Sequence, residues 1–203
     1  SDFTADSKQL GAPWLGMSIA DISRADRFLI VGSFLRKDHP VLAARIRQAV
    51  KKGAQANIIH SADDDLLMKV AHKAIVAPDA MVNLLLQVAQ ALAAEKQTSA
   101  SGLPQVTPST EAAAIARSMA SGERIAVLLG NFAQQHPQAA QLQALAQQIA
   151  TLSNGRFGFF SEAANSVGGY LAQAVPGAQG LNAAAMLAHP RKAYVLLNVE
   201  AEL

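Results

Sequence analysis

The chain has 203 residues, a formal net charge of +2 from 17 Lys and Arg against 15 Asp and Glu, and no Cys. A chain of this length buries roughly 70% of the surface that its unfolded form exposes, so its core needs no disulfide or metal. The absence of Cys excludes disulfides, zinc–thiolate sites and iron–sulfur clusters from these residues, and it is typical of an intracellular protein.

Targeting signals are absent from the sequence. It starts at Ser1 without a Met and without a basic segment followed by an apolar run, so we expect no signal peptide and interpret the chain as part of a longer protein. The longest apolar stretch, 81–94, contains Asn83, Gln87 and Gln90. It is shorter than the ~20 residues that span a bilayer, so no direct membrane insertion is expected.

The first predicted unit begins with the continuous apolar run 28–31, which is typical of a strand buried on both faces of a parallel sheet. Gly32 ends this strand. Pro40 stands at the first position of an amphipathic helical pattern that runs to Gly53. A second strand follows at 56–60.

Between the units we expect mostly helices. The three acidic residues 63–65 are placed to cap a helix that begins near Leu66, and a longer helix covers about 79–95. A segment rich in Ser, Thr, Gly and Pro, 98–109, is the predicted linker, and a helix of small residues follows at 110–121.

The second predicted unit repeats the order of the first. A strand at 125–129 leads into Gly130, Pro137 opens a helix that Gly155 closes, and a strand follows at 157–160. A last apolar strand is predicted at 193–199, at the end of the chain.

One sequence phrase therefore occurs twice. Ile-Val-Gly-Ser-Phe at 30–34 with His-Pro at 39–40 corresponds to Leu-Leu-Gly-Asn-Phe at 128–132 with His-Pro at 136–137. This duplication predicts an α/β fold with three-layer Rossmann-like parallel sheets, built from two related units at 1–97 and 110–203 that the linker 98–109 joins.

A strand that enters a Gly turn before a helix is also where α/β proteins bind phosphates, so both turns are candidate cofactor sites. The candidate residues are Gly32, Ser33, Gly130 and Asn131. Neither turn carries the Gly-x-Gly-x-x-Gly fingerprint or a Walker A sequence, and an aromatic residue follows closely in each, Phe34 in the first and Phe132 in the second. We therefore favour packed turns over phosphate cradles.

A third loop follows the last strand of the second unit. Asn165 and Ser166 offer polar groups, and the Gly pair at 168–169 offers backbone amides. The loop has no titratable partner besides Glu162, so a structural turn is the favoured interpretation.

No metal site and no catalytic residue are expected. His39, His136 and His189 each precede a Pro, where an imidazole is more apt to cap a helix or turn. His60 with the acidic run 63–65 is the one cluster that could bind a cation, but consecutive Asp side chains point in different directions. No Gly-x-Ser-x-Gly nucleophile elbow is present.

Basic residues concentrate in one part of the chain, which we call the basic strip: Arg36, Lys37, Arg45, Arg47, Lys51 and Lys52. The strip contains no interleaved aromatic residues, so nucleic acid is not an expected partner. A solvated helix face is the favoured interpretation, with a surface for an anion or a protein partner as the alternative.

Several of these segments together resemble the molybdopterin oxidoreductase domain: Ala25-Asp26, the run 30–33, His39-Pro40, Arg45-Ile46 and Lys52-Gly53. The segments 162–168 and 194–200 resemble the version of that domain found in bacterial NADH-quinone oxidoreductase, respiratory complex I, in the subunit designated G. The resemblance covers nearly the whole chain and implies the fold of the formate dehydrogenase and DMSO reductase relatives.

In active members of that family an Asp-Pro-Arg segment after the second strand holds a guanine dinucleotide of the molybdenum cofactor. This chain has His60, Ser61 and Ala62 there. The resemblance thus implies a domain without a cofactor of its own, with iron–sulfur clusters in the upstream part of the parent.

The resemblance further implies a non-catalytic structural and assembly domain. Its partners would be other peripheral-arm subunits of the NADH-quinone oxidoreductase, on the cytoplasmic side of the bacterial inner membrane. The parent would transfer electrons from NADH to quinone. The alternative function is a working molybdopterin- or nucleotide-binding oxidoreductase domain.

Overall fold

The structure is a computed structural model that describes residues 12–99, 102–177 and 180–196. Within these residues five parallel strands form one sheet, in the order β3-β2-β1-β4-β5. The strands are β1 (Arg27–Val31), β2 (Gln55–His60), β3 (His72–Ile75), β4 (Ile125–Leu129) and β5 (Arg156–Phe159). The chain is therefore an α/β protein, and strands from both predicted units share a single sheet.

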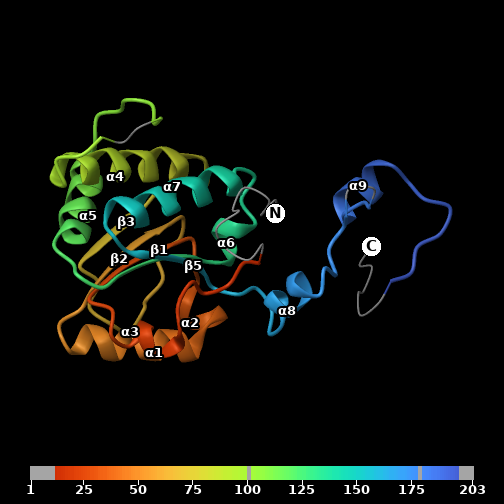
Figure 1. Ribbon diagram of the computed structural model, residues 1–203, viewed down its shortest axis with the longest axis horizontal. Helices are drawn as coiled ribbons and strands as arrows, with labels where there is room; N and C mark the ends of the chain where they lie inside the picture. Colours follow the sequence, from red (N-terminus) through yellow and green to blue (C-terminus); the bar gives the residue numbers. More distant parts are fainter. Residues whose placement is uncertain (1–11, 100–101, 178–179, 197–203) are drawn as a thin grey trace.

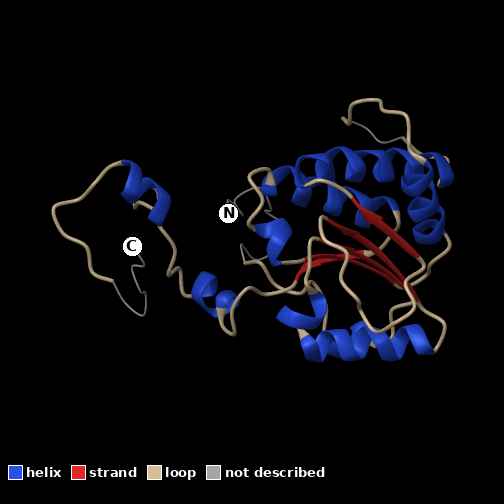
Figure 2. Ribbon diagram, turned by 180° about the vertical axis from the view of Figure 1, so that it is seen from behind, coloured by secondary structure: helices blue, strands red, loops and turns tan. Residues whose placement is uncertain are grey.

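Helices cover both faces of this sheet (Figure 1). The helices are α1 (Ile19–Ile22), α2 (Leu35–Asp38), α3 (Pro40–Lys51), η1 (Pro78–Ala80), α4 (Met81–Glu95), α5 (Thr110–Ala120), α6 (Asn131–Gln134), α7 (Ala139–Leu152), α8 (Ser166–Leu171) and α9 (Ala183–Ala188). One layer contains α4, α5 and α7, and the opposite layer contains α1, α2 and α3 (Figures 1 and 2).

The central strands are apolar on both faces because both faces are covered. All five residues of β4 are buried, and so are the last four of β1. The two strands are aligned so that Ile30 pairs with Leu128 and Val31 pairs with Leu129. The repeated sequence phrase thus lies side by side at the centre of the sheet.

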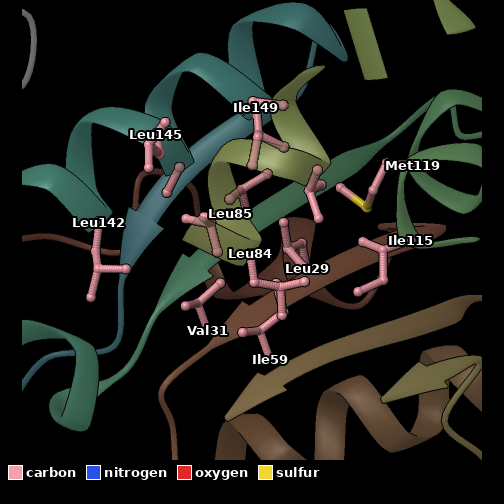
Figure 3. Close-up of a cluster of buried hydrophobic side chains, with 14 of the residues drawn as sticks. Leu29, Val31, Ile59, Leu84, Leu85, Ile115, Met119, Leu142, Leu145 and Ile149 are labelled. Atoms are coloured by element: carbon pink, nitrogen blue, oxygen red, sulfur yellow. The ribbon is translucent and has the colours of Figure 1, made fainter. Parts of the chain in front are cut away.

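The larger hydrophobic core lies between the sheet and the layer of α4, α5 and α7 (Figure 3). Leu29 and Val31 of β1 face Leu84 and Leu85 of α4, and α7 adds Leu142, Leu145 and Ile149. These α7 residues recur at spacings of three and four, so they form one helical stripe.

The smaller core lies on the opposite face. There Phe28 and Ile30 of β1 and Leu128 of β4 pack with Ile22 of α1 and Ile46 of α3, all at most 1% exposed. The alternation of Phe28 and Ile30 with Leu29 and Val31 divides β1 between the two cores.

Helix starts follow the local sequence. Pro40 occupies the first turn of α3, where its missing N–H would have no partner in the helix. The Ser109 side chain accepts the Ala112 N–H (3.2 Å) and caps α5. The Ser109 N–H in turn donates to Gln87 of α4 (2.9 Å), which ties the end of the predicted linker to the helix layer.

Two predictions of secondary structure are wrong. No helix begins near Leu66, because the Asp65 side chain accepts the Leu67 N–H (2.9 Å) and Leu67 adopts a left-handed φ of 51°. The chain then forms the edge strand β3, which the sequence did not indicate. The predicted strand at 193–199 is not formed at 193–196, and its residues 197–199 lie outside the described part.

The segment after β5 leaves the body of the protein. Figures 1 and 2 show α8 and α9 extending away from the sheet, and none of the described residues from 161 to 196 is buried. We call residues 161–196 the C-terminal arm. Among the described residues no helix is both long enough and apolar enough to span a bilayer.

Candidate functional site

The candidate site is the carboxyl edge of the sheet between β1 and β4. The strand order runs outward from β1 to β3 and then restarts at β4 on the other side. In open α/β sheets this change of direction leaves a crevice in which ligands usually bind. Because Val31 pairs with Leu129, the two turns that begin at Gly32 and Gly130 lie next to each other.

The first amide of each turn is already hydrogen-bonded within the sheet. The Gly32 N–H donates to the Ile59 carbonyl (2.8 Å), and the Gly130 N–H donates to the Val31 carbonyl (2.9 Å). The Gly32 carbonyl accepts the Ala133 N–H (3.2 Å). The first bond ties the first turn to β2, and the other two hold the two turns together, so none of these groups is directed at a ligand.

The glycines are required for this close packing. A Cβ on Gly130 would lie 2.3 Å from the Ser33 Cβ, and a Cβ on Gly32 would lie 2.7 Å from the Ala133 backbone nitrogen. Gly32 also has a φ of +58°, which favours glycine. The space that a phosphate would need beside each glycine is therefore filled by the other turn.

Three rings gather above the turns. The His60 ring, at the end of β2, lies 4.5 Å from the Phe34 ring and 5.1 Å from the Phe132 ring, centroid to centroid. The two Phe rings lie 6.4 Å apart in an edge-to-face arrangement. One aromatic residue from each repeat thus encloses His60, which is 3% exposed.

The neutral form of the His60 ring has a defined tautomer. Its Nδ1 accepts the Ala62 N–H (2.9 Å), so the proton is on Nε2. Burial lowers the pKa of His60 against the opposing charges of Asp64 and Asp38. A protonated Nε2 cannot accept a proton from Ser33, so Ser33, His60 and Asp64 do not form a catalytic triad.

Several polar atoms at this edge are buried and have no hydrogen-bond partner. They include Ser33 Oγ, Asn131 Oδ1, His39 Nε2 and His60 Nε2. The Asn131 side-chain nitrogen donates to the Asp38 carboxylate (3.3 Å). The structure therefore brings together four of the six candidate residues, Gly32, Ser33, Gly130 and Asn131.

The remaining two candidates lie in the C-terminal arm and make their hydrogen bonds locally. Ser166 Oγ accepts the Ala163 N–H (3.1 Å), and the Asn165 carbonyl accepts the Gly169 N–H (3.0 Å). Asn165 is exposed, and its amide oxygen occupies the space where a Gly168 Cβ would lie, at 2.1 Å. These contacts form a turn at the start of α8.

The histidines that precede Pro behave differently from one another. His136 caps its turn as predicted, because Nδ1 accepts the Gln138 N–H (3.0 Å) and Nε2 contacts the Pro78 carbonyl (3.0 Å). His39 makes no such cap, so that prediction is wrong. Its ring stacks on Phe160 at 5.0 Å because the neighbouring end of β5 supplies an apolar surface.

Two residues of the acidic run 63–65 interact with other residues of the protein. Asp63 forms an ion pair with Lys73 (2.6 Å), and Asp65 forms the turn at Leu67. In the described part of the chain, three or more His, Asp or Glu side chains nowhere converge as they would around a metal ion.

The basic strip lies on α2, α3 and the C-cap residue of α3, Lys52, with all six side chains exposed. Arg36 donates to the Asp65 carbonyl, and Lys37 Nζ lies 5.2 Å from the Phe34 ring centroid. Arg45 reaches the hydroxyl of Ser23 (3.3 Å). The strip is a solvent-facing surface of the smaller helix layer.

Comparison with known families decides which proteins this chain is related to. The family model for molybdopterin oxidoreductases matches residues 1–202. The chain belongs to the molybdopterin oxidoreductase family. No curated protein matches it significantly.

Among solved structures, this molybdopterin oxidoreductase domain is similar to a chain of the formyltransferase/hydrolase complex from Methylorubrum extorquens, determined in complex with methylofuran. The identity is 16% and the TM-score 0.49, over 78% of this chain and 42% of the other. The chain thus spans less than half of the length of that solved relative.

The residues at the carboxyl edge do not fit the dinucleotide part of the cofactor that the family name implies. A pyrophosphate needs free backbone amides and space beside glycine, whereas both glycines here pack against the other turn. His60 lies where a carboxylate would bind a ribose, and its ring is enclosed by Phe34 and Phe132.

The sequence did not reveal that Ser33, His60 and Asp64 line one small pocket. Ser33 is far from His60 and Asp64 in the chain, but one signal could have brought Ser33 and His60 together. Parallel pairing of the predicted strands 28–31 and 56–60 places the residues after Gly32 beside those at the end of the second strand.

Proposed function

We propose that this domain has a structural and assembly role in a bacterial NADH-quinone oxidoreductase, within the peripheral-arm subunit designated G, and performs no chemistry itself. The observation that carries the proposal is the exposure of apolar side chains on the C-terminal arm. Leu171, Leu187 and Val195 are 59%, 77% and 96% exposed there. Leu171 and Leu187 lie in six-residue helices and Val195 lies outside any helix, and apolar residues so exposed need another surface to pack against.

The carboxyl edge supports the same function. A ligand-binding domain of this fold would keep the crevice between β1 and β4 accessible, whereas here two glycine turns and three rings fill it. We infer that the domain retains a duplicated Rossmann-like architecture, with units at 1–97 and 110–203 and a linker at 98–109. The aligned repeats of β1 and β4 support that inference.

Under this proposal the partners are the other peripheral-arm subunits on the cytoplasmic side of the inner membrane, and the iron–sulfur clusters lie upstream in the parent. The parent carries electrons from NADH toward quinone. The basic strip is a second contact surface under this proposal. We therefore expect charge reversal at Arg45 and Arg47 to weaken assembly.

The arm is tested by introducing charge into its apolar face. We expect Leu171→Asp with Leu187→Asp, made in the full-length parent protein, to reduce co-purification with the other peripheral-arm subunits. The variant should fold normally, because neither side chain is buried. Ile19→Asp, at a residue 50% exposed on α1, is the matched control and should assemble normally. Unchanged assembly of the double variant would contradict the proposed role of the arm.

A second candidate function is a working molybdopterin- or nucleotide-binding oxidoreductase domain. It is favoured by Ser33 Oγ and Asn131 Oδ1, which are buried without partners at the carboxyl edge. Elemental analysis for molybdenum and calorimetry with guanine nucleotides distinguish the two functions. Stoichiometric molybdenum or micromolar nucleotide affinity would establish this candidate in place of the structural role.

A further inference from the structure

A small pocket lies where β1 and β2 end, on the side of the smaller core. Ser33, His60, Asp64 and Lys73 provide its polar lining, and Ile58 and Leu66 are among its apolar residues. It offers about 10 Å³ to the centre of a water molecule. One buried water needs roughly 10–15 Å³ by that measure.

Three of the four polar lining residues have an unpartnered buried atom, whereas Lys73 pairs with Asp63 and donates to the Asp64 carbonyl (3.2 Å). The unpartnered atoms are Ser33 Oγ, His60 Nε2 and Asp64 Oδ2. Ser33 and His60 are 5% and 3% exposed, so bulk water does not satisfy them. A buried polar atom without a partner costs about 1–3 kcal/mol, and three such atoms around one pocket need a common explanation.

The chemistry of the three atoms is complementary. The Ala62 N–H occupies His60 Nδ1, so Nε2 is a donor. Asp64 Oδ2 is an acceptor, and the Ser33 hydroxyl can donate or accept. A water molecule that accepts from His60, donates to Asp64 and bonds Ser33 makes three hydrogen bonds, which is the usual number for a buried water.

We propose that one ordered water occupies this pocket and joins the first glycine turn to the loop after β2. A cation fits the pocket poorly, because His60 Nε2 carries a proton and the lining already includes the ammonium-bearing Lys73. The inference goes beyond the proposed function and does not depend on it, since it concerns only how this edge of the sheet satisfies its own polar groups.

The water also gives the Ser33 hydroxyl a hydrogen-bond partner, so the burial of this hydroxyl does not require a ligand. Ser33 belongs to the turn after β1, and Asp64 belongs to the loop after β2. A bridging water therefore links the two strand ends with most of the enthalpy of a direct hydrogen bond.

The test uses the unmodified chain. In a crystal structure at about 1.5 Å resolution we expect one solvent peak at hydrogen-bond distance, roughly 2.7–3.2 Å, from His60 Nε2, Asp64 Oδ2 and Ser33 Oγ. An empty pocket, a direct bond between His60 and Asp64, or a peak with the shorter distances of a metal ion would overturn the proposal.

A solution measurement tests the hydrogen-bond pattern separately. Long-range ¹H–¹⁵N spectra distinguish the two neutral tautomers of histidine, and we expect His60 to carry its proton on Nε2. A proton on Nδ1 would remove the donor that the water needs and would overturn the proposal even if a solvent peak were seen. Loss of a bound nucleotide or of subunit assembly would not affect either measurement, so failure of the proposed function is distinguishable.

Discussion

Gly130 faces Ser33 so closely that a Cβ added to Gly130 would lie 2.3 Å from the Ser33 Cβ and 2.4 Å from the Gly32 carbonyl oxygen. The backbone of Gly130 is extended, with φ −89° and ψ 178°, a conformation that any residue adopts. The requirement for glycine here is therefore steric. It arises because the two repeats place their turns side by side.

We expect Gly130→Ala to destabilise the protein by about 1–3 kcal/mol, the usual cost of inserting a methyl group into a packed interior. Urea unfolding monitored by circular dichroism measures this change. Gly169→Ala is the matched control, because a Cβ on Gly169 meets no atom within 4 Å. Equal stability of the two variants would show that the turns are not packed as described.

The paired strands β1 and β4 give a second prediction. Ile30 and Leu128 are register partners and are 1% and 0% exposed. Ile30→Ala or Leu128→Ala should each lower the free energy of unfolding by about 2–5 kcal/mol, since each removes buried methyl groups and leaves a cavity. Val41→Ala, at a residue 68% exposed on α3, should change it by less than about 0.5 kcal/mol. A negligible loss at Ile30 and Leu128 would contradict their central placement.

Sequence periodicity was sufficient for the central strands and the long helices. The runs around Ile30 and Leu128 are apolar on both faces, and a buried parallel strand explains them best. The edge strand β3 could not be found in this way. Its residues alternate between half-exposed, exposed and buried over only four positions, and its sequence, His-Lys-Ala-Ile, carries no distinct period.

At the candidate site, too, features set by residue type could be predicted from the sequence, and features set by the fold could not. The Phe residues that follow the glycines indicated crowding, because their size is visible in the sequence. The orientation of His39 was not predictable, since its stacking on Phe160 depends on where the end of β5 lies in the sheet. The grouping of Ser33 with Asp64 likewise depends on the course of the loop after β2, where the sequence predicts a helix beginning near Leu66.

Acidification should destabilise the folded protein through His39 and His60. Burial lowers the pKa of both rings below the ordinary value of 6.5, with Asp38 opposing at both and Asp64 opposing at His60. The unfolded chain then binds more protons than the folded one once the pH falls through 6.5. The free energy of unfolding must therefore decrease in that window, down to the folded pKa values.

Urea unfolding at about pH 7.5 and about pH 5.5 measures this decrease. We expect a smaller decrease in His60→Gln and in His39→Gln than in the wild type. His189→Gln, at an exposed residue of the arm, should behave like the wild type. The lowered pKa of Asp21 does not contribute, because an acid affects stability only as the pH falls through its ordinary value of 3.8 and below. An equal pH dependence in all variants would refute the assignment.

The C-terminal arm should contribute little to the stability of the isolated chain, although its apolar residues suggest a role in assembly. Its six-residue helices are too short to be stable without a packing surface, and none of its described residues is buried. Truncation after Glu162 keeps the hydrogen bond from Gln135 to Glu162 (2.8 Å) and the whole sheet. We expect the free energy of unfolding to change by less than about 1 kcal/mol, because none of the described residues that the truncation removes is buried.

A chain that ends at Leu152 is the control for this truncation. It removes β5 and with it Phe159 and Phe160, which are 2% and 0% exposed, so cooperative unfolding should be lost. If the truncation after Glu162 were as damaging, the arm would have to pack on the body in solution, and its apolar residues would then not be available to a partner. Equal stability with and without the arm, combined with failure of the arm variants to assemble, would assign those residues to an interface.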